Sequence, residues 1–306
     1  MRPRTSLSII RALPAWATLC LLTAISTAAL AACGSQSGGS SPTPQATVTV
    51  TATPSAPPSS PSPSPTAAAT TTMALYFLRG EELGVAQRRA PLTPIPATAA
   101  IRTLLAGPTT AERAAGLTSA IPHGVHLLGL SLEGTTARID LSARFAAGGG
   151  SLSMQARVAQ VVYTLTRFRT IKAVDFMLDG SPVETLDGEG LVFDMEQTRA
   201  AWRRFEPAIF VETPGVGATL SSPFTISGTA SVFEGSFRAS LVDAGGGKIA
   251  SATIQASRGA PGRGRYREVV TFGAAEGRGA LIVYSQSMED GSHQNEVRIP
   301  VRFASD

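Results

Sequence analysis

Hydrophobic and polar residues follow three successive patterns along the 306-residue chain. Residues 1–32 combine early arginines with a long apolar run, and residues 34–72 contain neither charged nor aromatic side chains. From Met73 onward, short apolar segments recur with the regular spacing of strands and helices. Folded structure is therefore expected to begin at about Met73.

Up to about residue 206, strand-like and helix-like patterns alternate. Strands are predicted at 75–78, 83–89, 128–132, 139–141 and 174–178. One helix should begin near Pro96 and stop at Gly107-Pro108, and a second should be capped by Ser151. These elements predict an α+β domain at 73–206, with two helices packed on one face of an antiparallel or mixed sheet.

Two apolar faces are expected to cover the core of this domain. The alternating residues of the predicted hairpin at 128–141, which turns at Gly134, should bury one side. On that side lie Leu128, Leu130, Leu132, Ile139 and Leu141. On the second helix, the residues that share a side are Leu152, Val158, Val161, Val162 and Leu165. The strand at 174–178 should end in the turn Asp179-Gly180.

After about Pro207 the helical spacing disappears, and only short alternating runs remain. They lie at 209–211, 224–226, 237–241, 249–254, 266–272, 280–284 and 297–303. Gly, Pro, Asn and Asp separate these runs, which predicts an all-β sandwich at 207–306. The segment 195–206, with Trp202 and Phe205, is expected to be a helix-like connector.

The first apolar run ends in Leu30-Ala31-Ala32-Cys33, an arrangement typical of a lipoprotein signal. Cleavage between Ala32 and Cys33 would remove the signal peptide, residues 1–32, and the Cys33 thiol would carry a diacylglycerol. The alternative is an uncleaved anchor at residues 13–32, since about 20 apolar residues can span a bilayer. Both interpretations place the rest of the chain outside the cytoplasm, anchored to the cell membrane.

Residues 33–72 are expected to be a disordered linker. Eight prolines stand there among Ser, Thr, Ala and Gly, a composition that buries too little apolar surface to fold. Fully extended as polyproline, this segment would reach about 120 Å. Such a linker would either carry the folded part away from the membrane or serve only as a flexible spacer.

Charge and cysteine content exclude some classes of function. Arg2, Arg4 and Arg11 lie in the expected signal, and removing them from the formal +4 leaves the mature chain at +1. Nucleic acid is therefore not an expected partner. Cys20 would leave with the signal, so Cys33 would be alone and no intramolecular disulfide could form.

The candidate chemical groups favour a protein that is not an enzyme. The chain has no Gly-x-Ser-x-Gly motif, and no thiol other than the acylated one would remain. His123 and His126 could bind zinc only with a distant third ligand such as His293, and turn and strand-edge roles are favoured. Asp140 and Asp179 could form an acid/base couple, but a polar strand face and a turn suit them better. No metal or cofactor is expected.

Two other residue pairs could take part in contacts. Phe233 and Glu234 are either a core aromatic with a water-facing neighbour, or a strand-end patch that contacts a partner or glycan. Tyr163 and Arg167 lie four positions apart on the second helix. They could pack together or belong to a contact between domains, and packing is favoured.

Motifs between 73 and 195 suggest a family. They are Ala106-Gly107-Pro108 with the Gly-Leu-Thr-Ser-Ala-Ile-Pro-His-Gly stretch at 116–124, Ile-Asp-Leu-Ser-Ala-Arg-Phe at 139–145, and Gln-Val-Val-Tyr-Thr-Leu-Thr-Arg-Phe at 160–168. Together these motifs resemble the GerMN (sporulation and spore germination) domain.

The C-terminal part has motifs of its own. They are Pro214-Gly215, Ser222-Pro223, Ile226-Ser227-Gly228-Thr229-Ala230, Phe233-Glu234, Asp290-Gly291 and the segment 295–301. These motifs resemble the immunoglobulin-like domain of bacterial spore germination. The loop 260–265 departs from that pattern, because only Tyr266 is available there as the aromatic of the next strand.

The resemblance implies an immunoglobulin-like fold for 207–306 and a role without catalysis. GerMN domains are similar to ring-building modules of sporulation export machines, and the family has no established active site. The leading expectation is a non-enzymatic, membrane-tethered scaffold that binds other envelope proteins or a second copy of itself. The competing expectation is a wall-facing module that binds peptidoglycan or another polysaccharide.

Overall fold

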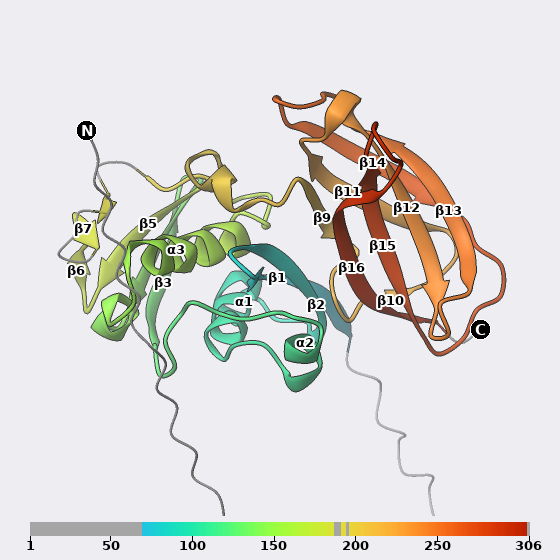
Figure 1. Cartoon of the computed structure of the whole chain (residues 1–306). Coiled ribbons are helices and arrows are strands. Elements are labelled where there is room, and N and C mark those ends of the chain that lie inside the picture. Colours follow the sequence, from blue (N-terminus) through green and yellow to red (C-terminus); the bar gives the residue numbers. More distant parts are fainter. Residues whose placement is uncertain (1–68, 187–190, 194–195, 305–306) are drawn as a thin grey trace, which may run out of the picture. The chain divides into compact units, whose positions relative to one another are not determined.

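The folded part of the chain begins with a long antiparallel hairpin. It consists of β1 (Thr70–Arg79) and β2 (Glu82–Pro91), and it turns at Gly80, whose φ is +64°. The structure is a computed structural model that describes residues 69–186, 191–193 and 196–304 (Figure 1). The predicted strands at 75–78 and 83–89 are confirmed, and both are longer than their apolar runs. Consecutive residues of β1 from Leu75 to Leu78 are buried, so both faces of this hairpin are covered.

Two short helices follow the hairpin. The helix α1 (Pro96–Leu105) begins at the predicted proline, and Ile101 and Leu104 are fully buried. A further helix, α2 (Thr110–Ala114), was not predicted, although its sequence contains a capping box. The N-cap Thr109 accepts from the Glu112 amide, and the Glu112 carboxylate accepts from Thr109 N at 2.7 Å.

A four-stranded sheet completes the N-terminal part. Its strands in spatial order are β3 (Leu127–Glu133), β4 (Thr136–Leu141), β5 (Ala173–Leu178) and β6 (Ser181–Pro182). The strands β4 and β5 are parallel, and the chain passes between them through η1 (Ala143–Ala146) and α3 (Ser151–Leu165). The other neighbouring pairs are antiparallel, so the sheet is mixed.

The prediction that the leucines of 128–132 face the core is wrong for two of the three. The side chains of Leu128 and Leu132 are 53% and 50% exposed. The pairing of β3 with β4 is irregular between Leu127 and Gly129, so Leu127 packs on the core in place of Leu128, and Leu132 lies near the end of β3. Ile139 and Leu141 on the neighbouring β4 are fully buried, as predicted.

The helix α3 is buried along most of its length and contacts α1, β1 and β5 (Figure 1). Two predictions about its first turn are wrong. Gly150 is the N-cap, while the Ser151 hydroxyl accepts from Gln155 Nε2 at 3.1 Å. Leu152 is 48% exposed because the first turn extends past the core, whereas Val158 and Val161 are fully buried.

A connector leads to the C-terminal part. After the short pair β7 (Thr185–Leu186) and β8 (Leu191–Val192), the chain forms the 3₁₀-helix η2 (Arg199–Phe205). Trp202 and Phe205 are buried, which agrees with a helix-like connector that packs on the core.

The C-terminal part contains two sheets. One has the order β10-β16-β15-β12-β13 and the other the order β14-β11-β9 (yellow to red in Figure 1). The elements are β9 (Ile209–Thr213), β10 (Thr219–Leu220), β11 (Phe224–Ala230), η3 (Phe233–Gly235), β12 (Ser236–Asp243), β13 (Lys248–Gln255), β14 (Gly264–Val270), β15 (Arg278–Gln286) and β16 (His293–Phe303). All seven predicted runs lie in these strands, except that β14 ends before Phe272; β10 was not predicted.

Side chains from the two sheets meet in an aromatic core. The ring of Phe237 on β12 packs edge-on against that of Tyr266 on β14, with centroids 4.9 Å apart. The Tyr266 hydroxyl donates to the carbonyl of Phe210 at 3.0 Å. Tyr266 therefore supplies an aromatic side chain to this core, although the loop 260–265 before it differs from the family pattern.

The described residues are mostly β, with few helices. Within them, no helix has the length and apolar character needed to cross a membrane.

Candidate functional site

The N-terminal and C-terminal parts are joined by backbone hydrogen bonds. The strand β2 pairs with the loop after β9: Gln87 N donates to Val216 O, and Val216 N donates to Val85 O, both at 2.8 Å. Gly215 passes so close that an added Cβ would lie 2.9 Å from Val85 O. The two parts thus share a short stretch of strand pairing.

Three aromatic rings pack beside this pairing. Tyr76 of β1 and Tyr163 of α3 lie 5.5 Å apart, and each ring centroid is 6.0 Å from that of Phe210 on β9. All three side chains are almost completely buried. We call this aromatic cluster, with the polar groups around it, the junction.

An ion pair crosses the junction. Arg199 of η2 donates through Nη1 to Glu212 Oε1 of β9 at 2.5 Å, and the Tyr76 hydroxyl donates to the same oxygen. Arg199 also donates to the carbonyl of Tyr163 at 3.1 Å and to Thr166 Oγ1 at 2.8 Å. Its guanidinium lies 4.6 Å from the Tyr163 ring centroid, so the cation contacts the ring face as well.

A second carboxylate, Glu206, fastens the end of the connector. It accepts from the Tyr163 hydroxyl at 2.6 Å and from Thr229 Oγ1 at 2.8 Å. Arg263 pairs with this carboxylate at 3.2 Å and donates to the carbonyl of Pro207 at 2.9 Å. The loop 260–265 therefore supplies a side chain that holds the connector in place.

The charge states at the junction favour a fixed joint over proton transfer. Burial raises the pKa of the Tyr76 hydroxyl well above its ordinary value, and Arg199 offsets only part of this effect. Burial and the Glu206 carboxylate raise the pKa of Tyr163 in the same way. For Glu212, burial alone would raise the pKa, but Arg199 and the Tyr76 hydroxyl outweigh it and hold the pKa below its ordinary value. At neutral pH both tyrosines are thus hydrogen-bond donors and Glu212 is ionised.

Comparison with known families gives an assignment for both parts of the chain. Residues 74–184 match the family model described as sporulation and spore germination. Residues 208–292 match the model of the immunoglobulin-like domain of bacterial spore germination. The chain carries a GerMN-like domain followed by an immunoglobulin-like spore germination domain. The family resemblance inferred from the motifs is therefore confirmed.

Three solved structures are similar to parts of this chain. The tandem GerMN domains of the sporulation protein GerM from Bacillus subtilis are 17% identical, with a TM-score of 0.39 and 60% of each chain covered. The chain thus spans about 60% of that structure's length. The first GerMN domain of the same protein is 22% identical over 43% of this chain and 99% of that one, with a TM-score of 0.37. A putative lipoprotein from Clostridium perfringens is 19% identical over 43% and 89%, with a TM-score of 0.32. No curated protein matched.

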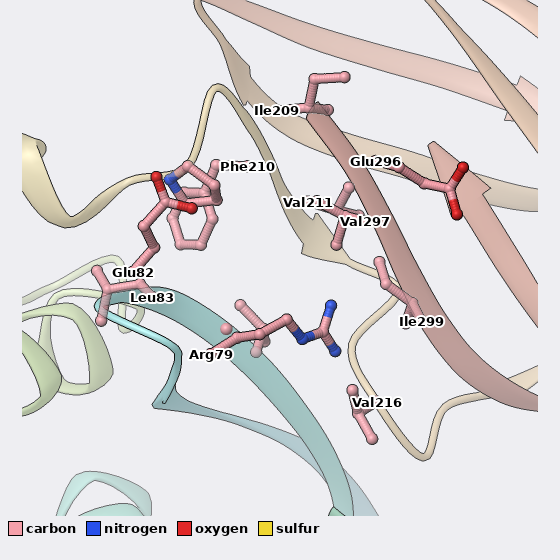
Figure 2. Close-up of a pocket in the computed structure, with 13 residues that line it drawn as sticks. Arg79, Glu82, Leu83, Ile209, Phe210, Val211, Val216, Glu296, Val297 and Ile299 are labelled. Atoms are coloured by element: carbon pink, nitrogen blue, oxygen red, sulfur yellow. The ribbon is translucent and has the colours of Figure 1, made fainter. Parts of the chain in front are cut away.

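A small pocket lies beside the junction, between the β1–β2 hairpin of the GerMN-like domain and β16. Figure 2 shows the Arg79 guanidinium pointing into this space, which is lined by Leu83, Val211 and Ile299 and has a volume of about 100 Å³. Arg79 donates to the carbonyl of Ala115 at 3.3 Å, and burial lowers its pKa. The space is sufficient for a few water molecules, not for a substrate.

The residues at the junction were only partly foreseen. Tyr163 and Arg167 do lie at the contact between the two domains, since Tyr163 packs on Phe210 and Arg167 donates to Thr213 Oγ1 at 3.3 Å. Of the two interpretations, the contact between domains is therefore confirmed, and the favoured one, packing of the two side chains on each other, is not. Arg199 and Glu212 were missed, because no local pattern marks two polar residues that meet only in the folded chain.

The structure does not bring the candidate metal-binding histidines together, and the two candidate acid/base aspartates bond to different backbone amides. His123 and His126 are exposed, and His293 stacks on Tyr284 in the immunoglobulin-like domain at 3.5 Å between ring centroids. Within the described ranges, no group of three His, Cys, Asp or Glu residues could hold a metal ion. The carboxylate of Asp140 accepts from the Gly180 amide at 3.1 Å, and that of Asp179 from the Ala143 amide at 3.2 Å. Both aspartates thus stabilise turns.

Phe233 and the predicted signal peptide are the remaining sequence predictions. Phe233 is 63% exposed, so its interpretation as a core aromatic is wrong. It is held at the surface because it lies in the turn η3, outside the strands. The predicted signal peptide, Ala32, Cys33 and most of the linker lie outside the described residues.

Proposed function

We propose that this protein is an exported lipoprotein, anchored through Cys33, that acts as a non-catalytic scaffold in sporulation, germination or envelope assembly. The two domains would work as one unit, held by the junction and carried away from the membrane by the segment 33–72. Its partners would be other envelope proteins or a second copy of the chain.

The observation that carries this proposal is the construction of the junction. Two hydrogen-bonded carboxylates, two arginines and three buried rings lie where the domains meet, and the tyrosines there stay protonated. Flexibly linked domains would need no such network, because interfaces between independent domains are usually small and polar. Both matched families are also described by sporulation and germination, not by a reaction.

One experiment with three strains tests the membrane anchor and the scaffold role together. Cells that produce the natural chain, Cys33→Ala or Arg199→Ala would be fractionated and treated with a short amine-reactive cross-linker. The natural chain should be acylated, fractionate with membranes and form defined cross-linked species. Cys33→Ala should be released or keep its signal, and Arg199→Ala should stay anchored but form fewer of these species.

The two halves of the proposal can fail separately. An unchanged mass and membrane fraction for Cys33→Ala would refute the anchor. Identical cross-linked species from the natural chain and Arg199→Ala would refute a scaffold that depends on the junction.

A further inference from the structure

A groove lies on the immunoglobulin-like domain, and none of the residues that line it belongs to the junction. It runs between the turn η3 and the hairpin that joins β15 to β16, and its volume is about 290 Å³. The lining residues that could contact a ligand are Phe233, Arg238, Thr253, Gln286, Met288 and Gln294. The volume is near the lower limit of the range typical of small-molecule sites.

Two large apolar side chains at this groove face solvent. Phe233 is 63% exposed and Met288 is 82% exposed. Both come from turns, so neither is needed to fill the core between the sheets. An exposed aromatic ring beside a groove offers a flat apolar surface to a ligand.

The same groove offers hydrogen-bonding groups that the folded domain leaves free. Arg238 uses Nε to donate to Gln286 Oε1 at 3.2 Å, which leaves its two terminal nitrogens available. The side chains of Gln294 and Thr253 take part in none of the hydrogen bonds within the described part of the chain. Amide, hydroxyl and guanidinium groups together supply both donors and acceptors.

The backbone beside the groove is held in an unfavourable conformation. Glu234 and Asn295 have φ values of 52° and 54°, and they are two of the three non-glycine residues with positive φ in the described ranges. Gln255 Nε2 donates to the Glu234 carbonyl at 2.7 Å, and Asn295 Nδ2 donates to Ser285 Oγ at 2.9 Å. Such conformations are unfavourable for residues other than glycine and cluster at functional sites.

We propose that this groove binds an uncharged oligosaccharide. The apolar C–H face of a sugar ring would stack on Phe233, and its hydroxyls would bond to Arg238, Gln286 and Gln294. The charges of Glu234 and Arg238 balance, so the groove selects neither anions nor cations. A peptide would lack the dense hydroxyls that these free groups can satisfy. The proposal goes beyond the scaffold function and does not depend on it.

Calorimetric titration of the full chain in detergent with chitohexaose and with cellohexaose tests this site. At least one of the two should bind, and Phe233→Ala should weaken the affinity at least about tenfold. Gln294→Ala should weaken it by a smaller factor, about threefold to tenfold. The control is Val269→Ala on β14, which removes an equally exposed apolar side chain (57%) outside the groove and should leave the affinity unchanged.

Because Phe233 and Gln294 are exposed, their replacement should leave the circular dichroism melting curve unchanged. The proposal is overturned if neither oligosaccharide binds the natural chain. Binding that survives both groove substitutions, or that Val269→Ala weakens as much, overturns it as well. Self-association that Phe233→Ala abolishes, without any sugar binding, would assign the groove to a second copy and overturn it too.

Discussion

At the scale of single residues, Gly228 is the glycine of the described residues at which an added Cβ would meet its neighbours most closely. Gly228 lies on β11 where the pairing with β9 is irregular. A Cβ there would lie 1.9 Å from the carbonyl oxygen of Phe210 and 2.8 Å from the Tyr266 hydroxyl. The side chain of Phe210 belongs to the junction, so Gly228 links the packing of the sheet to the contact between the domains.

Gly228→Ala should destabilise the protein by about 3 kcal/mol or more, because backbone atoms must move to admit the methyl group. Thermal unfolding followed by circular dichroism would measure this as a lowered Tm. The matched control is Gly129→Ala on β3, where a Cβ would meet only Asp140 Cβ at 3.7 Å. A Gly228→Ala chain as stable as the control would show that β11 and β9 are not held this closely.

At the scale of elements, α3 joins the hairpin to the loops of the GerMN-like domain through buried polar side chains. Gln160 is fully buried; it accepts from the Ala120 amide at 2.9 Å and donates to the Tyr76 carbonyl at 3.2 Å. One turn earlier, Arg157 donates to the carbonyls of Phe145, Ala147, Gly148 and Ala120. Burial lowers the pKa of Arg157.

Gln160→Met keeps the approximate shape of the side chain but leaves the half-buried Ala120 amide and the buried Tyr76 carbonyl without this partner. The expected loss of unfolding free energy is about 2–4 kcal/mol, since each such group costs about 1–3 kcal/mol. Urea unfolding would measure it, with Leu152→Ala on the exposed first turn of α3 as the control. Equal stability of the two variants would contradict the role given to Gln160.

Periodicity in the sequence predicted most of the elements but not their environment. The alternation at 128–132 identified a strand, yet which leucines are covered depends on the irregular pairing beside Leu128 and on where the strand ends. The short helix α2 has too few residues to show a period, and only its capping box marks it. Trp202 and Phe205 stand three positions apart, a spacing that predicted a helix-like connector. Both side chains are buried in the folded chain, so this prediction is confirmed.

At the scale of the whole molecule, the junction depends on pairs that are distant in sequence. Tyr76 and Glu212 are 136 positions apart, so no local pattern could bring them together in a prediction. The sequence left Phe233 open between the core and a contact patch, and only the fold shows that its side chain is exposed. The signal sequence, in contrast, is a local pattern, and the sequence alone could suggest it.

The junction should also respond to acid. The folded-state pKa of Glu212 lies below its ordinary value, so ionisation of this group stabilises the folded junction. That contribution is complete above the unfolded pKa, about 4.3 for a glutamate, and is lost as the pH falls through the folded value.

The central claim, that the two domains act as one unit, can be tested most directly by a distance measurement. Ser131→Cys and Ser251→Cys would place one spin label on an exposed site of each domain, in a chain that also carries Cys20→Ser and Cys33→Ser. Pulsed electron resonance should give one narrow distance distribution at neutral pH. Arg199→Ala should broaden it several-fold, because the loss of one partner leaves Glu212 buried without its cation. If the distance distribution with Arg199 intact is as broad as that of Arg199→Ala, the claim that the two domains act as one unit is contradicted.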